Sequence, residues 1–220
     1  MAEPNVTVAR PEPPGPDPTP AQMLRALRRA NDIAQRSLDQ GHHPFGALLL
    51  APDHETVLAE QGNVDSVNHA EAVLARNAAA QHSADYLWAC TLVTTVEPCC
   101  MCAGTQYWAN IGRLVYGMEE RRLLALTGSH AENPTMDLPC REVFSHGQKA
   151  IRVWGPVPDA EAVLARTAAA RWAPDELWRC TLYTTVEPCC MCAGTQYWAH
   201  IGRLVYGMAG PASGSRRGCR

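Results

Sequence analysis

Apolar positions recur at helical spacing near the start of the chain and then in short runs. Residues 21–41 carry an apolar stripe that stops at Gly41 and is formed by Met23, Leu24, Leu27, Ala30, Ile33, Ala34 and Leu38. This spacing predicts an amphipathic helix that packs on another layer. The apolar runs FGALLLA (45–51) and ETVLAEQ (55–61) flank the turn-forming letters PDH, a pattern typical of a β-hairpin.

Helical and strand patterns then alternate as far as residue 156. The patterns predict helices over 69–82 and 99–112, and strands over 90–98, 113–118 and 150–156. Strands that alternate with helices favour a three-layer α/β/α sandwich around a mixed five-stranded sheet. We expect this domain to span residues 21–158, with a variable stretch over 119–148.

The second part of the chain repeats the first. Residues 69–118 and 159–208 align without a gap, and the letters TTVEPCCMCAGTQYWA occur unchanged in both copies. The second copy has Asp159 in the place of His69 and has no counterpart of the two hairpin runs. We therefore expect residues 159–208 to be an appended, degenerate partial repeat without activity. Its first residues could instead form the C-terminal helix of the preceding domain.

The two ends of the chain have the composition of unpacked segments. Residues 1–20 combine repeated prolines with acidic residues and have neither the basic start nor the apolar run of a signal peptide. We expect a disordered arm there and a flexible tail over residues 209–220. No apolar run approaches the ~20 residues that a membrane-spanning helix needs. The expectation is therefore a cytoplasmic protein with no membrane partner.

The charge balance and the cysteine usage narrow the classes of function. The chain has 19 Lys and Arg residues against 22 Asp and Glu residues, and this formal net charge of −3 does not favour a nucleic-acid partner. Most of the 10 cysteines stand in two CCMC clusters. Such clusters indicate a metal site rather than a disulfide framework.

Cys99 and Cys102 lie three positions apart at the start of a predicted helix and so share one face, where the helix N-terminus favours thiolates. Taken alone, this pair is compatible with a catalytic metal, a redox pair or a structural zinc knuckle. His69 opens the preceding predicted helix, and Glu71 follows two positions later. If His69 completes a His-Cys-Cys site, a zinc ion has three protein ligands and an open position for water, whose pKa it lowers. Glu71 then suits the transfer of that water's proton.

The motifs H-x-E and P-C-x-x-C occur in this order, within NHAEAVLA (68–75) and TTVEPCCMCAGTQYWA (94–109). This combination is the signature of zinc deaminases of nucleobases. The chain resembles the cytidine deaminase-like superfamily, in the branch of guanine deaminases and tRNA adenosine deaminases, over about residues 21–156. The resemblance implies a catalytic Zn²⁺ whose three ligands would be His69, Cys99 and Cys102. It also implies that Glu71 would be the proton shuttle.

The resemblance also implies contacts with the substrate. Asn63 matches the asparagine that hydrogen-bonds the base in this branch, and Phe45 and Gly46 match the strand segment that lines the base pocket. Trp108 matches an aromatic position of guanine deaminases, and the backbone N–H of Ala70 would face the base. From the residues alone, Asn63 is also compatible with a turn, and Phe45 and Trp108 with core positions.

We therefore expect a zinc-dependent hydrolase that deaminates a small nucleobase or nucleoside and releases ammonia. The letters QYWA favour a guanine-type purine, and cytosine and the adenosine of tRNA are the alternatives. The mildly acidic balance argues against tRNA. The segment 119–148 matches neither guanine deaminases nor tRNA adenosine deaminases, so it does not identify the base. A zinc-stabilised scaffold without catalysis is the alternative outside the enzymes.

Members of the family commonly associate through the helices that carry the zinc ligands. We therefore expect a homodimer, or an intramolecular pseudo-dimer in which the copied segment 159–208 takes the place of a partner subunit. The letters CCMCAGTQYWA, which would form this face in both copies, support the hypothesis.

Overall fold

The computed structural model describes residues 11–127, 136–157, 181–186, 201 and 203–208. The chain divides into two compact units: the first holds residues 1–124 and 128–157, and the second holds residues 125–127 and 158–220. Each unit is described by itself. The predicted tail over 209–220, the start of the predicted arm and most of the predicted second copy lie outside the described residues.

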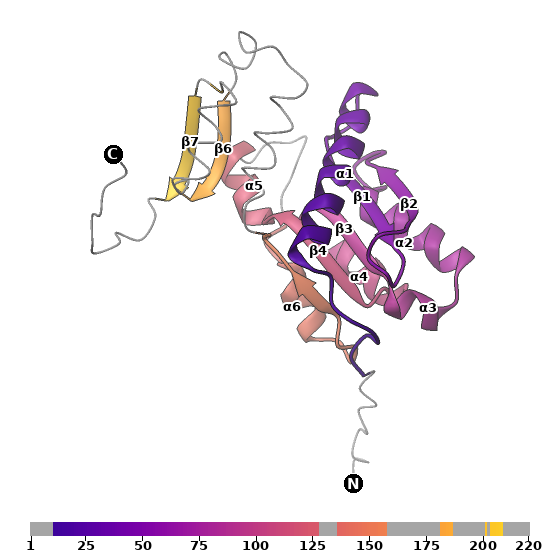
Figure 1. The fold of residues 1–220 in the computed structure, drawn as a ribbon. Coiled ribbons are helices and arrows are strands. Elements are labelled where there is room, and N and C mark those ends of the chain that lie inside the picture. Colours follow the sequence, from indigo (N-terminus) through magenta and orange to yellow (C-terminus); the bar gives the residue numbers. More distant parts are fainter. Residues whose placement is uncertain (1–10, 128–135, 158–180, 187–200, 202, 209–220) are drawn as a thin grey trace, which may run out of the picture. The chain divides into compact units, whose positions relative to one another are not determined.

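Helix α1 (Pro20–Asp39) confirms the predicted amphipathic helix (Figure 1). Thr19 begins it with a capping box: its hydroxyl accepts the backbone N–H of Gln22, and the Gln22 side chain accepts the backbone N–H of Thr19. The predicted apolar stripe is buried along most of its length, but Leu38 in the last turn is exposed. A Cβ at Gly46 would collide with the backbone of α1, so this helix packs directly on the first strand.

A mixed five-stranded sheet forms the centre of the first unit and confirms the predicted fold class. Its strand order is β2-β1-β3-β4-β5 (Figure 1). The strands are β1 (Gly46–Leu50), β2 (Val57–Gly62), β3 (Thr91–Val96), β4 (Arg113–Met118) and β5 (Arg152–Trp154). The predicted hairpin is the antiparallel pair β1–β2, and β1 also pairs antiparallel with β3. Strands β3, β4 and β5 are parallel to one another.

Helices cover both faces of this sheet, as predicted. Alternate residues of β1 point to opposite faces: Leu48 and Leu50 pack with α1, whereas Ala47 and Leu49 pack with helices α2 (Ala70–Gln81) and α4 (Cys100–Trp108). The second layer also includes Cys140 and Phe144 of helix α6 (Cys140–Ser145). One apolar core therefore holds α1 against one face of the sheet, and the other holds α2 and α4 against the opposite face.

The sequence pattern missed three short helices. Helix α3 (Ala84–Ala89) begins at Ser83, whose hydroxyl accepts the backbone N–H of Tyr86. Helices α5 (Glu120–Thr127) and α6 lie in the stretch 119–148, for which no element was predicted. The N-cap serine before α3 is a signal that could have been used, but no comparable side-chain cap precedes α6.

The structure differs from the expected disordered arm at residues 11–19, which pack on the first unit. The Trp88 indole N–H donates to the carbonyl of Pro11. The buried Arg113 guanidinium donates to the carbonyls of Pro13, Pro14 and Gly15. Proline-rich composition suggested disorder, but proline leaves its carbonyl free to accept, and one buried cation collects these acceptors. None of the helices within the described ranges is long and apolar enough to cross a membrane.

The second unit contains a two-stranded sheet formed by β6 (Thr181–Val186) and β7 (Arg203–Met208). The strands are parallel, and Thr181 pairs with Arg203. This pair is the copy of β3 and β4, in which Thr91 pairs with Arg113.

Candidate active site

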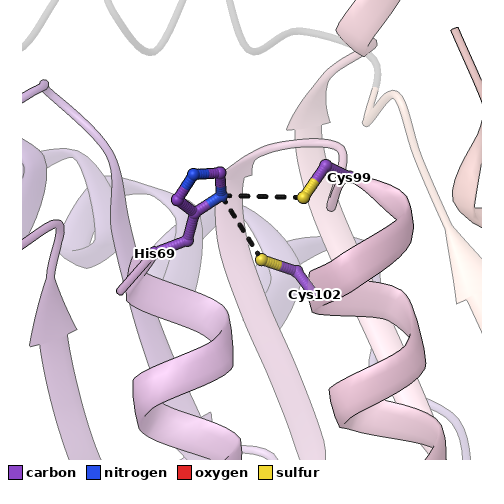
Figure 2. Close-up of side chains that lie close together, drawn as sticks. All are labelled: His69, Cys99 and Cys102. Atoms are coloured by element: carbon purple, nitrogen blue, oxygen red, sulfur yellow. Dashed lines mark hydrogen bonds between the residues drawn. The ribbon is translucent and has the colours of Figure 1, made fainter. Parts of the chain in front are cut away.

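Two helix N-termini bring the predicted metal ligands together. His69 is the N-cap residue of α2 and Cys99 is that of α4, while Cys102 lies in the first turn of α4. Neither N-cap side chain makes the usual capping hydrogen bond. Figure 2 shows that the three side chains point toward one another from the ends of two neighbouring helices. The positive ends of both helix dipoles therefore favour thiolates and anionic species at this point.

The geometry of the three side chains fits a tetrahedral metal ion. His69 Nδ1 lies 3.6 Å from Cys99 Sγ and 3.6 Å from Cys102 Sγ (Figure 2). All three ligand atoms lie within 4.8 Å of one another. With Zn–S distances of about 2.3 Å and Zn–N distances of about 2.05 Å, a tetrahedral zinc ion requires an S···N separation of about 3.6 Å. The donor set and its spacing therefore suit Zn²⁺.

The three side chains shift one another's pKa values through their mutual hydrogen bonds. The hydrogen bond with Cys102 lowers the pKa of the Cys99 thiol to about 4, and His69 acts in the same direction. The hydrogen bond with Cys99 and burial raise the pKa of the Cys102 thiol, and Cys99 raises the pKa of His69. A divalent cation between the sulfurs would replace these protons and hold both as thiolates.

Glu71 lies next to the three ligands as a buried carboxyl group. It is 6% exposed and accepts a hydrogen bond from the Thr94 hydroxyl on β3. It also interacts with the Cys102 thiol. Burial raises the pKa of Glu71 above its usual range, although the hydrogen bond from Thr94 opposes the shift. A carboxyl group with a raised pKa can both accept and release a proton near neutral pH.

A pocket of about 210 Å³ opens beside these residues and is lined by His69, Glu71 and Cys99. This volume is below the ~300–1,000 Å³ of pockets that hold drug-sized ligands, so it suits a small planar molecule. Phe45 and Asn63 also line it. The hairpin brings them together, because the Asn63 N–H donates to the Phe45 carbonyl at the end of the β1–β2 ladder.

Asn63 offers a hydrogen-bond acceptor to this pocket. The residue is 4% exposed, and its side-chain amide donates to the carbonyl of Asp65. Its Oδ1 atom is buried and has no hydrogen-bond partner among the described residues. A buried acceptor without a partner is costly, so a ligand that supplies an N–H group would stabilise it.

Three predicted substrate residues do not line this pocket. Gly46 packs against α1, and Ala70 is fully buried in the core between α2 and the sheet. Trp108 is 76% exposed and lies in a separate groove with Arg76 and Gly104. Gly46, Ala70 and Trp108 are therefore not among the residues that line this pocket, and their expected contacts with the substrate stay predictions.

The pocket contains residues that the sequence pattern did not single out. His43 lines the pocket and stacks on Phe45 with an interplanar angle of 1°. Glu97, Glu120 and Leu123 also line the pocket. Glu97 directly precedes Pro98 of the P-C-x-x-C motif, so its position was a usable signal. Glu120 and Leu123 belong to the variable stretch and had no such signal.

The family described as the cytidine and deoxycytidylate deaminase zinc-binding region matches residues 20–118 and again residues 121–208. A probable cytosine deaminase of Schizosaccharomyces pombe is 31% identical over 144 residues, which cover 64% of this chain and 88% of that protein. A guanine deaminase of Bacillus subtilis is 36% identical over 98 residues, covering 42% and 62%. A tRNA-specific adenosine deaminase of Haemophilus influenzae is 33% identical over 107 residues, covering 46% and 61%.

A solved structure supports the fold. A crystal structure of a mutant protein in complex with 8-azaguanine covers 68% of this chain and 85% of that chain, with a TM-score of 0.51 and 23% identity. The family matches cover most of the chain, and the His-Cys-Cys geometry provides the metal site that they require. The chain therefore belongs to the cytidine and deoxycytidylate deaminase family and is a zinc-dependent hydrolytic deaminase.

Proposed function

We propose that the first unit deaminates a free nucleobase or nucleoside, with a guanine-type purine as the preferred substrate. In this proposal His69, Cys99 and Cys102 hold the zinc ion, and Glu71 transfers protons. The observation that carries the proposal is the buried carboxyl of Glu71, which lies beside all three ligand atoms and lines the same pocket. A scaffold without catalysis would gain nothing from such a group.

The reaction consumes one water molecule and breaks the bond between a ring carbon and its amino group. Zinc held by the three ligands would supply hydroxide near neutral pH. Glu71 transfers the two protons of the attacking water, one to the ring nitrogen next to the attacked carbon and one to the amino group, which leaves as ammonia while the ring carbon becomes a carbonyl. Thr94 keeps the Glu71 carboxyl in place through its hydrogen bond. Phe45 and Asn63 orient the ring in the pocket.

The charges around the pocket favour a substrate without phosphate. Four acidic residues line it, namely Asp65, Glu71, Glu97 and Glu120. None of the described lining residues is a lysine or an arginine. A phosphate group that extends beyond the zinc site would meet like charge without a lysine or arginine among the described lining residues to compensate it. The pocket therefore suits a base or nucleoside better than a nucleotide or the backbone of tRNA.

The preference for guanine is supported by the hydrogen-bond acceptors of the pocket. Free guanine has an N–H group on its imidazole ring, away from the carbon that bears the amino group, and Asn63 Oδ1 is an acceptor without a partner in the described residues. The guanine deaminase of Bacillus subtilis is one of the relatives. Cytosine is the second candidate, because the relative from Schizosaccharomyces pombe that covers 64% of this chain is a probable cytosine deaminase.

Ammonia release tests the proposal directly. Purified, zinc-loaded protein is incubated in parallel with guanine, guanosine, cytosine, cytidine, adenosine, guanosine monophosphate and a tRNA anticodon stem. We expect the highest kcat/KM for guanine and a much lower value for the monophosphate. A higher value for cytosine would replace guanine as the substrate, and a higher value for the tRNA stem would contradict the argument from charge. No ammonia from any substrate at one zinc per chain would favour the scaffold.

The repeat supplies a matched control for the proton shuttle. Glu71→Gln should lower kcat by roughly 10²–10⁴-fold without loss of zinc, because general acid and base catalysis contributes this much. Glu161→Gln makes the same change at the corresponding position of the second copy. This control should leave kcat and zinc content unchanged. Equal losses in both variants would contradict the assignment of catalysis to the first copy.

We also propose that the outer face of α2 and α4 is an interface between two copies of this chain. A shallow groove of about 550 Å³ runs along it and is lined by residues that include Arg76, Met101 and Gly104. Trp108 is 76% exposed beside it. An exposed tryptophan next to an apolar groove is typical of association surfaces.

The mass in solution tests this interface. A Cβ at Gly104 would meet no atom within 4 Å, so Gly104→Glu should preserve the fold and place a charge in the groove. We expect a dimer for the wild type and a monomer for Gly104→Glu by light scattering. Deleting residues 172–220 should leave the dimer intact. A wild-type monomer that dimerises only after this deletion would show that the copied segment covers the face instead.

A further inference from the structure

Glu97 lies between the metal-ligand turn and the variable stretch of the chain. It directly follows β3 and precedes Cys99 by two residues. Its backbone N–H donates to the carbonyl of Met118 at 2.7 Å, which extends the parallel pairing of β3 and β4 by one position. The residue is 6% exposed. Its backbone is therefore fixed by the sheet, and its carboxyl group is held inside the protein.

The two oxygens of this carboxyl group accept from the first residues of two different helices. Oε1 accepts the backbone N–H of Cys140, the first residue of α6, at 3.0 Å. Oε2 accepts the backbone N–H of Glu120, the first residue of α5, at 3.4 Å. The first N–H groups of a helix have no partner within the helix, and a carboxylate also compensates the positive end of the helix dipole. One side chain thus caps both helices.

Three described residues between these two caps form part of the pocket wall. Glu120 and Leu123 of α5 line the pocket, and so does Met136, which precedes α6. Met136 also contacts Cys100, which lies between Cys99 and Cys102 in the sequence. The distance between the two sulfur atoms is 3.1 Å. Both ends of this wall are therefore fixed to a residue of the metal-ligand turn.

We propose that Glu97 is a positioning residue: by capping α5 and α6 together, it holds the wall residues Glu120, Leu123 and Met136 at the substrate pocket. The proposal rests on the proposed deaminase function of this site. Because these wall residues line the pocket and the candidate zinc ligands are three other residues, Glu97 governs substrate binding rather than zinc retention. It also gives the variable stretch a fixed attachment, so that changes of sequence there can alter the pocket without moving the ligands.

Glu97→Gln tests the proposal with a small change of shape. The amide keeps one accepting oxygen, but its NH₂ group cannot accept the second backbone N–H. We expect faster hydrogen exchange at the amides of Glu120 or Cys140, with unchanged exchange in α1 and one zinc per chain. We also expect KM to rise by about tenfold while kcat changes by less than about threefold, because a charge-assisted hydrogen bond behind the wall is lost. Glu97→Asp, which keeps the charge, should recover part of the KM.

The second copy again provides the control, because Glu187 stands in the same TTVEPCCMC context. Glu187→Gln should leave exchange in residues 120–140 and KM unchanged. Loss of zinc in Glu97→Gln with unchanged exchange at 120–140 would overturn the proposal, and so would faster exchange with an unchanged KM. If the wild type deaminates none of the substrates, the proposed function fails, while the exchange experiment still decides whether Glu97 caps the two helices.

Discussion

The two copies of the repeat form the same pair of strands in different surroundings. Thr91 pairs with Arg113 in the first copy and Thr181 pairs with Arg203 in the second, so the parallel register is the same. The first pair lies inside a five-stranded sheet, between β1 and β5, whereas the described part of the second unit contains a sheet of two strands. The repeated sequence thus specifies the strand pair, and the rest of the domain comes from elsewhere in the chain.

The active site needs both the repeated and the unrepeated sequence. The repeat provides the three candidate metal ligands, Glu71 and Glu97. The hairpin before it provides Phe45 and Asn63, and the segment after it provides Glu120 and Leu123. A copy that begins at residue 159 and ends at residue 208 has no counterpart of these flanking segments in its own sequence. Duplication of the metal motif alone is therefore insufficient to duplicate the pocket.

The largest effect should come from making the first copy resemble the second at one position. His69→Asp replaces the imidazole that lies 3.6 Å from both sulfurs. The shorter carboxylate cannot occupy the position of Nδ1, so we expect zinc affinity to fall by more than the ~10–100-fold that loss of an outer partner of a ligand costs. Zinc per chain, measured by elemental analysis, and ammonia release should fall together.

The reverse change separates the ligand from its surroundings. Asp159→His restores the H-x-E motif in the second copy, and we expect no added ammonia release because the copy has no hairpin of its own. Activity gained in Asp159→His protein that also carries Glu71→Gln would show that the flanking strands are unnecessary. Full zinc content in His69→Asp would contradict the ligand assignment itself.

The next largest effect should be on the free energy of unfolding, when the two equivalent arginines, Arg113 and Arg203, are replaced. Arg113 has a side-chain exposure of 0%, donates to the carbonyls of Ala89 and Pro14, and lies 3.8 Å from Asp17. Arg203 is exposed. Arg113→Met leaves buried carbonyls without donors and should lower the free energy of unfolding by about 2–4 kcal/mol. Arg203→Met should stay within about 0.5 kcal/mol. Urea denaturation followed by circular dichroism compares them, and equal losses would contradict the difference in burial.

The sheet and the metal ligands could be predicted from the sequence because their signals are local. The continuous apolar run of β1 and the β-branched run of β3 reflect burial on both faces, which the structure confirms. The ligand motif could be recognised because a helix N-terminus fixes the spacing of Cys99 and Cys102. His69 could be recognised for the same reason, because it is the N-cap residue of the neighbouring helix α2.

The remaining parts depend on contacts between distant residues, which a periodic pattern does not record. The arm around Pro14 is ordered by the buried Arg113, about a hundred positions away in the chain. The first backbone N–H groups of helices α5 and α6 donate to the carboxyl group of Glu97, which is distant in the sequence, and not to a neighbouring capping side chain. Trp108 was linked to the substrate by resemblance, but its exposed side chain lies on α4 outside the pocket.

A smaller effect on catalysis should follow from removing the acceptor that only the first copy possesses. Asn63→Ala deletes the buried Oδ1 atom and should lower kcat/KM for guanine by about tenfold, the value of one hydrogen bond to the substrate, without loss of zinc. Asn77→Ala is the control, because Asn77 is exposed on α2 and the second copy has Thr167 there. An unchanged kcat/KM in Asn63→Ala would remove Asn63 from the substrate contacts.

The smallest effect should be a pH-dependent one in the turn of the hairpin that the second copy lacks. The Thr56 hydroxyl and the backbone N–H groups of Glu55 and Thr56 donate to Asp53 and lower its pKa from 3.8 to about 2. Because the pKa is lower in the folded state, the ionised carboxylate stabilises the turn above pH 4, and this contribution is lost as the pH falls from about 4 to 2. Asp53→Asn should therefore melt below the wild type at pH 7, and the difference in Tm should shrink toward pH 2. A difference that persisted at pH 2 would show that Asp53 acts through its shape, and the hairpin would then owe its stability to β1 and β2 rather than to the charge in its turn.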